Sequence, residues 1–99
     1  MNRKFKNQKE LFMHVWNSRP HVSEVSGKPL LSIGHDLWYW QFAHVLSKGS
    51  YPSCKLKEEN IMLMLPDEHK NQEQYPEFIV RREKLRSQYY KEIHGKVFD

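Results

Sequence analysis

Residues 38–44 read WYWQFAH and residues 60–65 read NIMLML, and these two stretches decide the fold of the chain. In the first stretch, large aromatic residues alternate with smaller or polar ones, which is the period-two pattern of a β-strand. The second stretch is a short apolar run, typical of a buried strand. Residues 47–59 between them contain Gly49, Pro52 and several polar side chains, which indicates a loop. The sequence therefore predicts two strands joined by a loop.

The segment before the first strand predicts one helix followed by irregular chain. Residues 5–18 have the spacing of an amphipathic helix, and Arg19-Pro20 ends it. Residues 21–29 are predicted to be extended with a turn at Ser26-Gly27. Residues 30–36 are predicted to be irregular.

Two further helices are predicted after the second strand. One begins at Pro66, because the fixed φ of proline suits a first helical position and the two acidic residues that follow suit the positive end of a helix dipole. This helix is expected to run toward Tyr75-Pro76, where it ends or bends. The last helix is expected to close near Gly95. Its apolar markers are Phe78, Leu85 and Tyr89.

The composition indicates one folded domain of the α+β class that spans residues 1–99. Of these residues 38% are hydrophobic and 28% are charged, which is typical of a globular chain and excludes a disordered one. A chain of this length buries a single modest core. The aromatic content of 13% is high, and we expect large rings to form that core. The candidates are Trp16, Trp38, Trp40, Phe42 and Phe78.

Several classes of protein and site are excluded by the sequence. The single cysteine, Cys54, excludes an internal disulfide and a zinc site built from cysteines. No apolar run approaches the roughly 20 residues that span a bilayer. Residues 1–10 lack the apolar stretch of a secretion signal, so a reducing cytoplasm is the expected location. The sequence has no phosphate-binding loop, nucleophile elbow or dinucleotide fingerprint.

Four side chains are candidates for one reactive site. The predicted order of strand, loop, strand and helix brings His44, at the end of the first strand, close to a helix that carries His69. The unperturbed pKa of histidine is about 6.5, so a neutral His44 can take a proton from water. His69 and Glu73 are four residues apart and are expected on one helical face, where they can hold one metal ion. Asn60, at the end of the loop, can orient the imidazole or bind the ion.

Three stretches carry a resemblance to a known family, namely RPHVSEVSGKPLL (residues 19–31), FAHVLSKGSYP (42–52) and ENIMLMLPDEH (59–69). They resemble the entry segment, the strand end with its Ser-Lys-Gly loop, and the Asn-bearing strand with its His-bearing helix of small HNH endonucleases. These enzymes belong to the ββα-metal superfamily, and the compact type occurs in bacteriophage and bacterial genomes. The match forms a motif core at about residues 19–75, flanked by N- and C-terminal helices.

The resemblance implies hydrolysis of phosphodiester bonds in DNA with one divalent metal ion, either Mg²⁺, Mn²⁺, Ni²⁺ or Zn²⁺. His44 would be the general base, Asn60 its positioning partner or a metal ligand, and His69 a metal ligand. RNA is the alternative substrate. A bacteriophage origin, the host cytoplasm as location and other phage proteins as partners are further implications. The oligomeric state stays open between a monomer and a dimer.

The chain departs from the family pattern at two places. Ala43 stands where members commonly carry an Asp or His that binds the metal, so another ligand such as Asp36 or Glu73 would have to replace it. Ser23 and Ser26 stand where a zinc-binding Cys-x-x-Cys pair is usual, and serine hydroxyls are poor zinc ligands. The alternative interpretation is a catalytically inactive HNH-like module that binds nucleic acid or a protein.

The charge of the chain favours a polyanionic partner. The formal net charge is +4 and the isoelectric point is about 9.2. Lys48 in the loop is a candidate phosphate contact. Arg81 and Arg82, with Lys84 and Arg86, form a basic stripe on the last helix that can bind a nucleic-acid backbone, and a solvated helix face is the alternative for that stripe.

Overall fold

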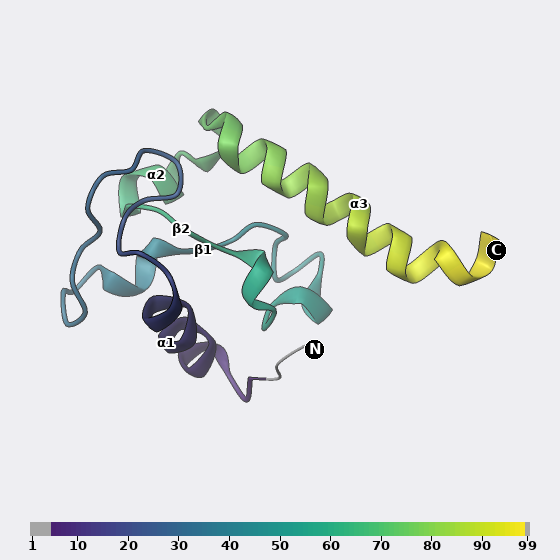
Figure 1. Cartoon of the computed structure of the whole chain (residues 1–99), viewed down its shortest axis with the longest axis horizontal. Helices are drawn as coiled ribbons and strands as arrows, with labels where there is room; N and C mark the ends of the chain where they lie inside the picture. Colours follow the sequence, from purple (N-terminus) through teal and green to yellow (C-terminus); the bar gives the residue numbers. More distant parts are fainter. Residues whose placement is uncertain (1–4, 99) are drawn as a thin grey trace.

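The computed structural model describes residues 5–98, and their side chains through residue 93. It has an α+β fold in which a short antiparallel pair of strands lies between helices (Figure 1). Helix α1 lies on one side of the strand pair, and the long helix α3 lies on the other side. The elements are α1 (Gln8–Ser18), β1 (Phe42–His44), β2 (Ile61–Leu63), α2 (Pro66–Lys70) and α3 (Pro76–Phe98).

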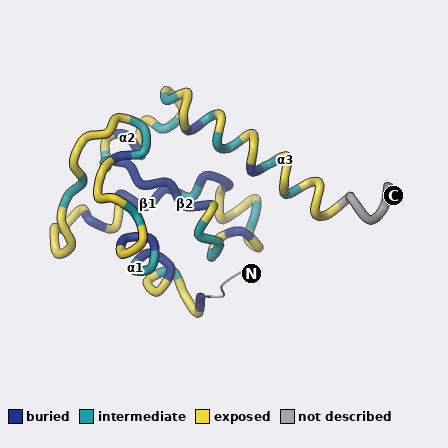
Figure 2. Tube along the Cα trace, viewed as in Figure 1, coloured by how far each residue is buried: buried dark blue, intermediate teal, exposed yellow. Residues whose placement is uncertain are grey.

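The register of the strand pair divides the core into two clusters. Phe42 pairs with Leu63 and Ala43 with Met62, while His44 pairs with Ile61. Because side chains alternate along a strand, Phe42 and Leu63 pack toward α1, and Ala43 and Met62 pack toward α3. Both faces of the pair are therefore covered, and the strands are buried except at His44, which is half-buried (Figure 2).

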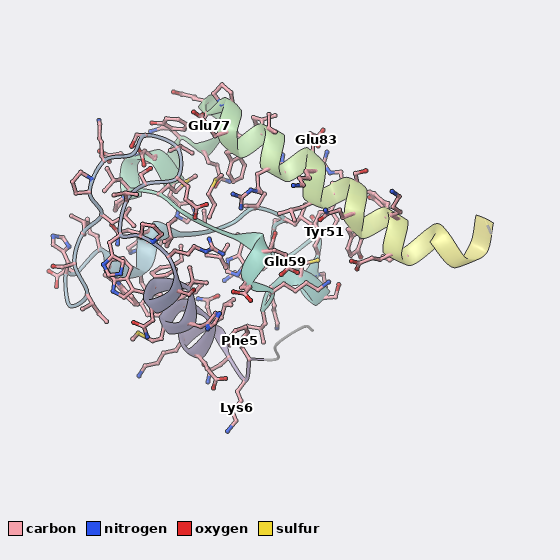
Figure 3. The ribbon with its side chains drawn as sticks, viewed as in Figure 1. Phe5, Lys6, Tyr51, Glu59, Glu77 and Glu83 are labelled. Carbon is pink, nitrogen blue, oxygen red and sulfur yellow. The ribbon has the colours of Figure 1, made fainter. Side chains whose placement is uncertain are left out.

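Helix α1 confirms the amphipathic helix predicted at the N-terminal end. The side chain of Asn7 caps it by accepting a hydrogen bond of 2.9 Å from the N–H of Glu10, and the helix ends at Ser18, before the extended backbone of Arg19. Phe5, labelled in Figure 3, precedes the helix and is also buried. The side chains that α1 buries against the strands are Leu11, Phe12, Val15 and Trp16.

The first predicted strand is largely a 3-10 turn, which corrects the sequence analysis. Residues Trp38–Gln41 form this turn, and only Phe42–His44 pair as a strand. With three residues per turn, Trp38 and Gln41 share the inward side, while Tyr39 and Trp40 face outward. Trp40 is 62% exposed, so its prediction as a core residue is wrong. The other four core candidates are buried, namely Trp16, Trp38, Phe42 and Phe78.

The second predicted strand and the helix after it are both shorter than expected. Asn60 ends a 3-10 turn at Glu58–Asn60, and the strand spans Ile61–Leu63. Helix α2 begins at Pro66 as predicted, but it ends at Lys70 and a separate 3-10 turn follows at Gln72–Gln74. The predicted helix therefore does not continue to Tyr75-Pro76.

Helix α3 is the longest element of the described chain. It runs through Gly95 to Phe98, so its predicted end near Gly95 is wrong. Phe78 and Leu85 are buried against the strand pair, and Tyr89 contacts the ring of Tyr51 with centroids 4.9 Å apart. Tyr51 is labelled in Figure 3 beside the helix. The C-terminal part of α3 extends beyond the body of the molecule (Figure 1).

The segment between α1 and the Trp38–Gln41 turn is held by a bridge and by one buried amide. Val22 and Pro29 form an isolated antiparallel bridge around a turn at Gly27, whose φ of 77° confirms the turn predicted there. The side chain of Gln41 is fully buried and pairs with both backbone groups of Leu31, at 2.6 and 3.1 Å. Among the residues from 5 to 98, no helix is long and apolar enough to cross a membrane.

Candidate functional site

The two predicted histidines line one pocket on the α1 side of the strand pair. The pocket has a volume of about 460 Å³ and opens between the start of α1, the Trp38–Gln41 turn and the end of β1. His44 enters it from β1 and His69 from α2, and Lys48 comes from the loop after β1. The other lining residues are Gln8, Phe12, Tyr39, Trp40, Phe42 and Ser47.

His44 is held in one orientation by the backbone. Its Nε2 atom lies 2.9 Å from the carbonyl oxygen of Lys55. Because a carbonyl only accepts hydrogen bonds, Nε2 must carry the proton, and the neutral ring then keeps its lone pair on Nδ1. The ring of Phe12 packs beside the imidazole with centroids 6.0 Å apart. The geometry therefore leaves Nδ1 as the basic atom of His44.

The surroundings of His44 favour its neutral form. Desolvation by burial is the largest cause and lowers the pKa of His44 below its usual 6.5. The hydrogen bond to the Lys55 carbonyl acts in the opposite direction, while the nearby charges of Lys48 and His69 lower the pKa further. His44 is consequently a free base at neutral pH, which is the state a proton acceptor needs.

His69 is anchored in the same way from a different element. Its Nδ1 atom lies 2.7 Å from the carbonyl oxygen of Trp40 and must donate to it, which leaves the lone pair on Nε2. Histidines that bind metals usually donate their other ring nitrogen to a carbonyl or carboxylate in this manner. The structure thus brings two imidazoles together, each with one nitrogen fixed by the backbone and one unprotonated nitrogen.

Asn60 does not line this pocket, although sequence analysis placed it in the site. Its side chain is 1% exposed; its oxygen accepts the N–H of Leu46 at 2.7 Å, and its nitrogen donates to the carbonyls of Leu46 and Cys54 at 2.9 and 3.3 Å. These contacts fix the chain two residues after His44 and one residue before Lys55. Asn60 is therefore placed to position the loop around His44, and this placement does not fit a metal ligand in the pocket.

Glu73 also lies apart from the two histidines. Helix α2 ends before it, so Glu73 and His69 do not share a helical face, contrary to the expectation from their spacing. The carboxylate of Glu73 forms an ion pair with Arg82, and the hydrogen bond from Arg82 lowers the pKa of Glu73. Glu73 is not among the residues that line the pocket.

The basic stripe on α3 is largely paired with carboxylates. Arg81 lies 3.2 Å from Glu24, and Arg82 pairs with Glu73. Arg86 pairs with Glu83, which is labelled on α3 in Figure 3. Arg81 and Arg82, predicted to contact nucleic acid, thus belong to ion pairs within the chain. Of the predicted contacts, Lys48 is the one that lies in the pocket.

Ala43 faces the opposite side of the strand from His44. Its side chain is fully buried in the cluster that packs against α3, and it pairs with Met62. Because neighbouring residues on a strand point to opposite faces, a carboxylate at position 43 would enter this cluster and not the pocket. Asp36, the other candidate replacement ligand, is exposed and does not line the pocket either.

The donor atoms of the pocket fit some divalent ions better than others. The lining residues include no carboxylate, and among the side chains of residues 5–93 no group of three His, Cys, Asp or Glu is placed to hold a metal ion. Imidazole nitrogen suits Zn²⁺ and Ni²⁺, whereas Mg²⁺ is bound mainly through carboxylates and water. The donor type of the pocket therefore suits Zn²⁺ or Ni²⁺ better than Mg²⁺, but His69 alone is fewer than the three or four protein ligands usual for zinc.

Two residues that position the site were missed by sequence analysis. Glu68 of α2 is 5% exposed and accepts a hydrogen bond of 2.6 Å from the hydroxyl of Ser23 and one of 2.8 Å from the N–H of Leu65. It ties the Ser23 turn to the helix of His69. Trp40 holds His69 through its carbonyl. The sequence signal for Glu68 was its position in the first turn of α2, since acidic residues there often cap the helix. The role of Trp40 had no such signal.

Comparison of the chain with protein-family models, curated proteins and solved structures finds no match.

Proposed function

We propose that this chain is a metal-dependent endonuclease of the HNH type, which hydrolyses phosphodiester bonds in DNA. One observation carries the proposal. His44 and His69 line the same pocket, each bound to a backbone carbonyl through one nitrogen and each left with one unprotonated nitrogen, beside the ammonium group of Lys48. The chain order of β1, β2 and α2 supports a ββα-metal fold around these residues.

His44 is the general base of the proposed reaction. Its Nδ1 atom takes a proton from the attacking water, and the oxygen of that water forms the new bond to phosphorus while the bond to the leaving oxygen breaks. The low pKa of His44 keeps this nitrogen unprotonated at neutral pH. The Lys55 carbonyl holds the ring and stabilises the imidazolium that forms, because Nε2–H is a stronger donor once the ring is charged.

His69 and Lys48 serve the phosphate. His69 is the protein ligand for a divalent ion, through Nε2. When bound, such an ion supplies positive charge that stabilises the leaving oxygen. Lys48 supplies a further positive charge at the pocket, and the side chain of Gln8 holds its Nζ at 3.3 Å.

A plasmid-nicking assay tests the proposal. The protein is incubated with supercoiled plasmid and Zn²⁺, Ni²⁺, Mn²⁺ or Mg²⁺, with EDTA as control. Chelator-sensitive nicking is expected, strongest with an ion that imidazole favours. His44→Ala should lower the rate by about 10²–10⁴-fold, the usual contribution of a general base. Unchanged nicking by this variant would refute the role of His44.

Two matched variants separate the roles of the histidines. His69→Ala should raise the metal concentration needed for half-maximal nicking, whereas His44→Ala should lower the maximal rate at saturating metal. His35 is an exposed histidine outside the pocket, so His35→Ala is the control and should nick like the wild type. An RNA substrate in the same assay tests the alternative polymer.

A second function is favoured by the absence of a carboxylate from the lining of the pocket. In that case the chain is a catalytically inactive HNH-like module that binds nucleic acid or a protein. Retarded migration of the plasmid without nicking, under every metal condition, would support the binding module and exclude the enzyme.

A further inference from the structure

Trp40 is an exposed aromatic residue at the centre of the site. The chain has three tryptophans; Trp16 and Trp38 are 5% and 7% exposed, whereas Trp40 is 62% exposed. The 3-10 turn directs its side chain outward while its carbonyl binds His69. A large ring left in water beside a reactive pocket is a feature of ligand-binding surfaces.

A second hollow adjoins the first at Trp40 and His69. It shares Trp40 and His69 with the first pocket and also has a volume of about 460 Å³. Both volumes lie within the range of about 300–1,000 Å³ that is usual for small-ligand sites. The second hollow is lined in addition by Leu37, Pro66, Asp67, Lys70 and Gln72. Trp40 thus forms a partition between two adjacent hollows.

The ring of Trp40 is free to stack, while that of its neighbour is engaged. Tyr39 contacts the rings of Phe12 and Trp38, with centroids 5.2 and 5.6 Å apart. Within residues 5–93, Trp40 makes no contact with another aromatic ring. An indole that is 62% exposed and packs on no other described aromatic ring is available to a ligand ring.

The charges around the two hollows complement phosphate. Lys48 lines the first hollow and Lys70 the second, and both carry a positive charge. Asp67 is the single carboxylate in either lining. Cations spaced on both sides of an aromatic ring match a nucleotide strand, in which phosphates flank each base. An apolar peptide would not use these charges.

We propose that Trp40 stacks on an unpaired base of single-stranded nucleic acid and that this strand crosses both hollows, an inference that rests on the proposed nuclease function. A duplex keeps both faces of each base stacked on its neighbours, so the indole face has no partner there until a base is extruded. A single strand offers each base face at little cost. The substrate class is therefore single-stranded or locally unpaired nucleic acid.

Binding in the absence of catalysis tests this inference. A labelled 12-nucleotide DNA strand, its duplex and the RNA strand of the same sequence are titrated with protein in EDTA, and fluorescence anisotropy gives each Kd. The single strand should bind at least tenfold more tightly than the duplex. Trp40→Ala should weaken single-strand binding by roughly 5- to 150-fold, the range for loss of one stacked base. Trp40→Phe should retain most of the affinity.

Two controls make the result specific. Val80 is 67% exposed on α3 and lines neither hollow, so Val80→Ala should bind like the wild type. Stacking should also quench the tryptophan fluorescence of the wild type but not that of Trp40→Phe, in which the two buried tryptophans remain. Circular dichroism checks that each variant is folded, which we expect because the Trp40 side chain is exposed.

The possible outcomes separate this inference from the proposed function. Equal affinity for the single strand and the duplex, no binding to either, or unchanged binding by Trp40→Ala would overturn the role of Trp40, whether or not the protein nicks plasmid. Selective, Trp40-dependent binding in EDTA without nicking under any metal condition would support the stacking site and reject the enzyme. The DNA and RNA arms distinguish the two polymers.

Discussion

The amide side chain of Asn60 binds both backbone groups of Leu46, accepting from its N–H at 2.7 Å and donating to its carbonyl at 2.9 Å. Leu46 follows His44 by two residues, and the same amide also donates to Cys54, next to the carbonyl that holds His44. A buried side chain thus replaces the strand partner that this part of the loop lacks. Asn60 thus joins the two segments of the chain that carry His44 and its carbonyl partner, Lys55.

Removing this amide should destabilise the protein. Asn60→Ala leaves the two buried backbone groups of Leu46 without their partner, whereas the Cys54 carbonyl keeps its bond from the Lys57 N–H. Each unpaired group costs about 1–3 kcal/mol, so we expect a loss of roughly 2–5 kcal/mol. Urea denaturation measures the free energy of unfolding. Asn71 makes one exposed side-chain bond, to the carbonyl of Asp67, and Asn71→Ala should cost less than about 1 kcal/mol. Equal losses in the two variants would contradict the proposed role of Asn60.

The pKa of His44 should lie below that of an ordinary histidine. Burial, the largest cause, lowers the pKa of its ring, so in the folded protein the ring protonates at a pH below about 6.5. The unfolded chain then binds the proton more readily, so the contribution of His44 to stability is complete above pH about 6.5 and is lost as the pH falls through the folded pKa. NMR titration of the ring signals, assigned with His44→Gln, gives the midpoint. A midpoint at or above 6.5 would show that burial does not control this group.

The contact between Ser23 and Glu68 should stabilise the protein most above the ordinary carboxyl pKa. Burial raises the pKa of Glu68, but hydrogen bonds from Ser23, Ser26 and the Leu65 N–H outweigh it, and the pKa lies below its usual 4.5. This stability is present above pH 4.5 and is lost as the pH falls through the folded pKa. Ser23→Ala should cost about 1–3 kcal/mol at neutral pH.

A pH series of urea denaturation curves tests the Ser23 contact. The difference in the free energy of unfolding between the wild type and Ser23→Ala should become smaller as the pH falls below 4.5. Ser50 is an exposed serine, and Ser50→Ala should match the wild type at every pH. If the difference in unfolding free energy between Ser23→Ala and the wild type stays constant with pH, the hydrogen bond to Glu68 is not the source of the stabilisation by Ser23.

Arg19 should not be replaceable by lysine. Its guanidinium donates to the carbonyls of Glu58 and Ile61, both at 2.6 Å, and to the carboxylate of Glu24 at 2.9 Å. A lysine ammonium cannot present this planar fork, so Arg19→Lys should cost about 1–3 kcal/mol by thermal or urea denaturation. Arg86→Lys, at a surface ion pair, should change stability by less than about 0.5 kcal/mol. An Arg19→Lys variant as stable as the wild type would contradict this prediction.

Lys48 should contribute more to nucleic-acid binding than Arg82 does. Lys48 lines the pocket and donates to the neutral amide of Gln8, whereas Arg82 is paired with Glu73 and lies over the ring of Phe78. Lys48→Ala should weaken binding and reduce the slope of log Kd against log salt by about one unit. Arg82→Ala should leave the affinity within about twofold. The reverse order would place the nucleic acid on α3.

The sequence predicted the positions of the two pocket histidines better than it predicted the residues around them. His44 at a strand end and His69 on a helix were both expected, and they line a common pocket. Trp40 was misassigned because aromatic residues at 38, 40 and 42 fit a strand as well as they fit a 3-10 turn, and only packing against α1 decides between them. Backbone partners such as the Lys55 carbonyl have no sequence signature.

The break in helix α2 shows why Glu73 was misplaced. The spacing of His69 and Glu73 fits a continuous helix, but the side chain of Asn71 donates to the carbonyl of Asp67 at 2.8 Å and its backbone leaves the helical region, with φ −110° and ψ 29°. Asparagine competes in this way for backbone groups near helix ends. Glu73 then turns toward Arg82, a partner nine residues away that local patterns do not identify.

Strands of only three residues give this protein an unusual distribution of mutational sensitivity. Polar side chains hold the backbone around the pocket through hydrogen bonds. Exchanges among aliphatic residues of the core should therefore be tolerated. Changes at the hydrogen-bonding polar residues should not be tolerated, even when the new side chain has nearly the same shape. Saturation mutagenesis under selection for folding is expected to show its strictest positions at polar residues. Those positions are Arg19, Ser23, Gln41, Asn60 and Glu68.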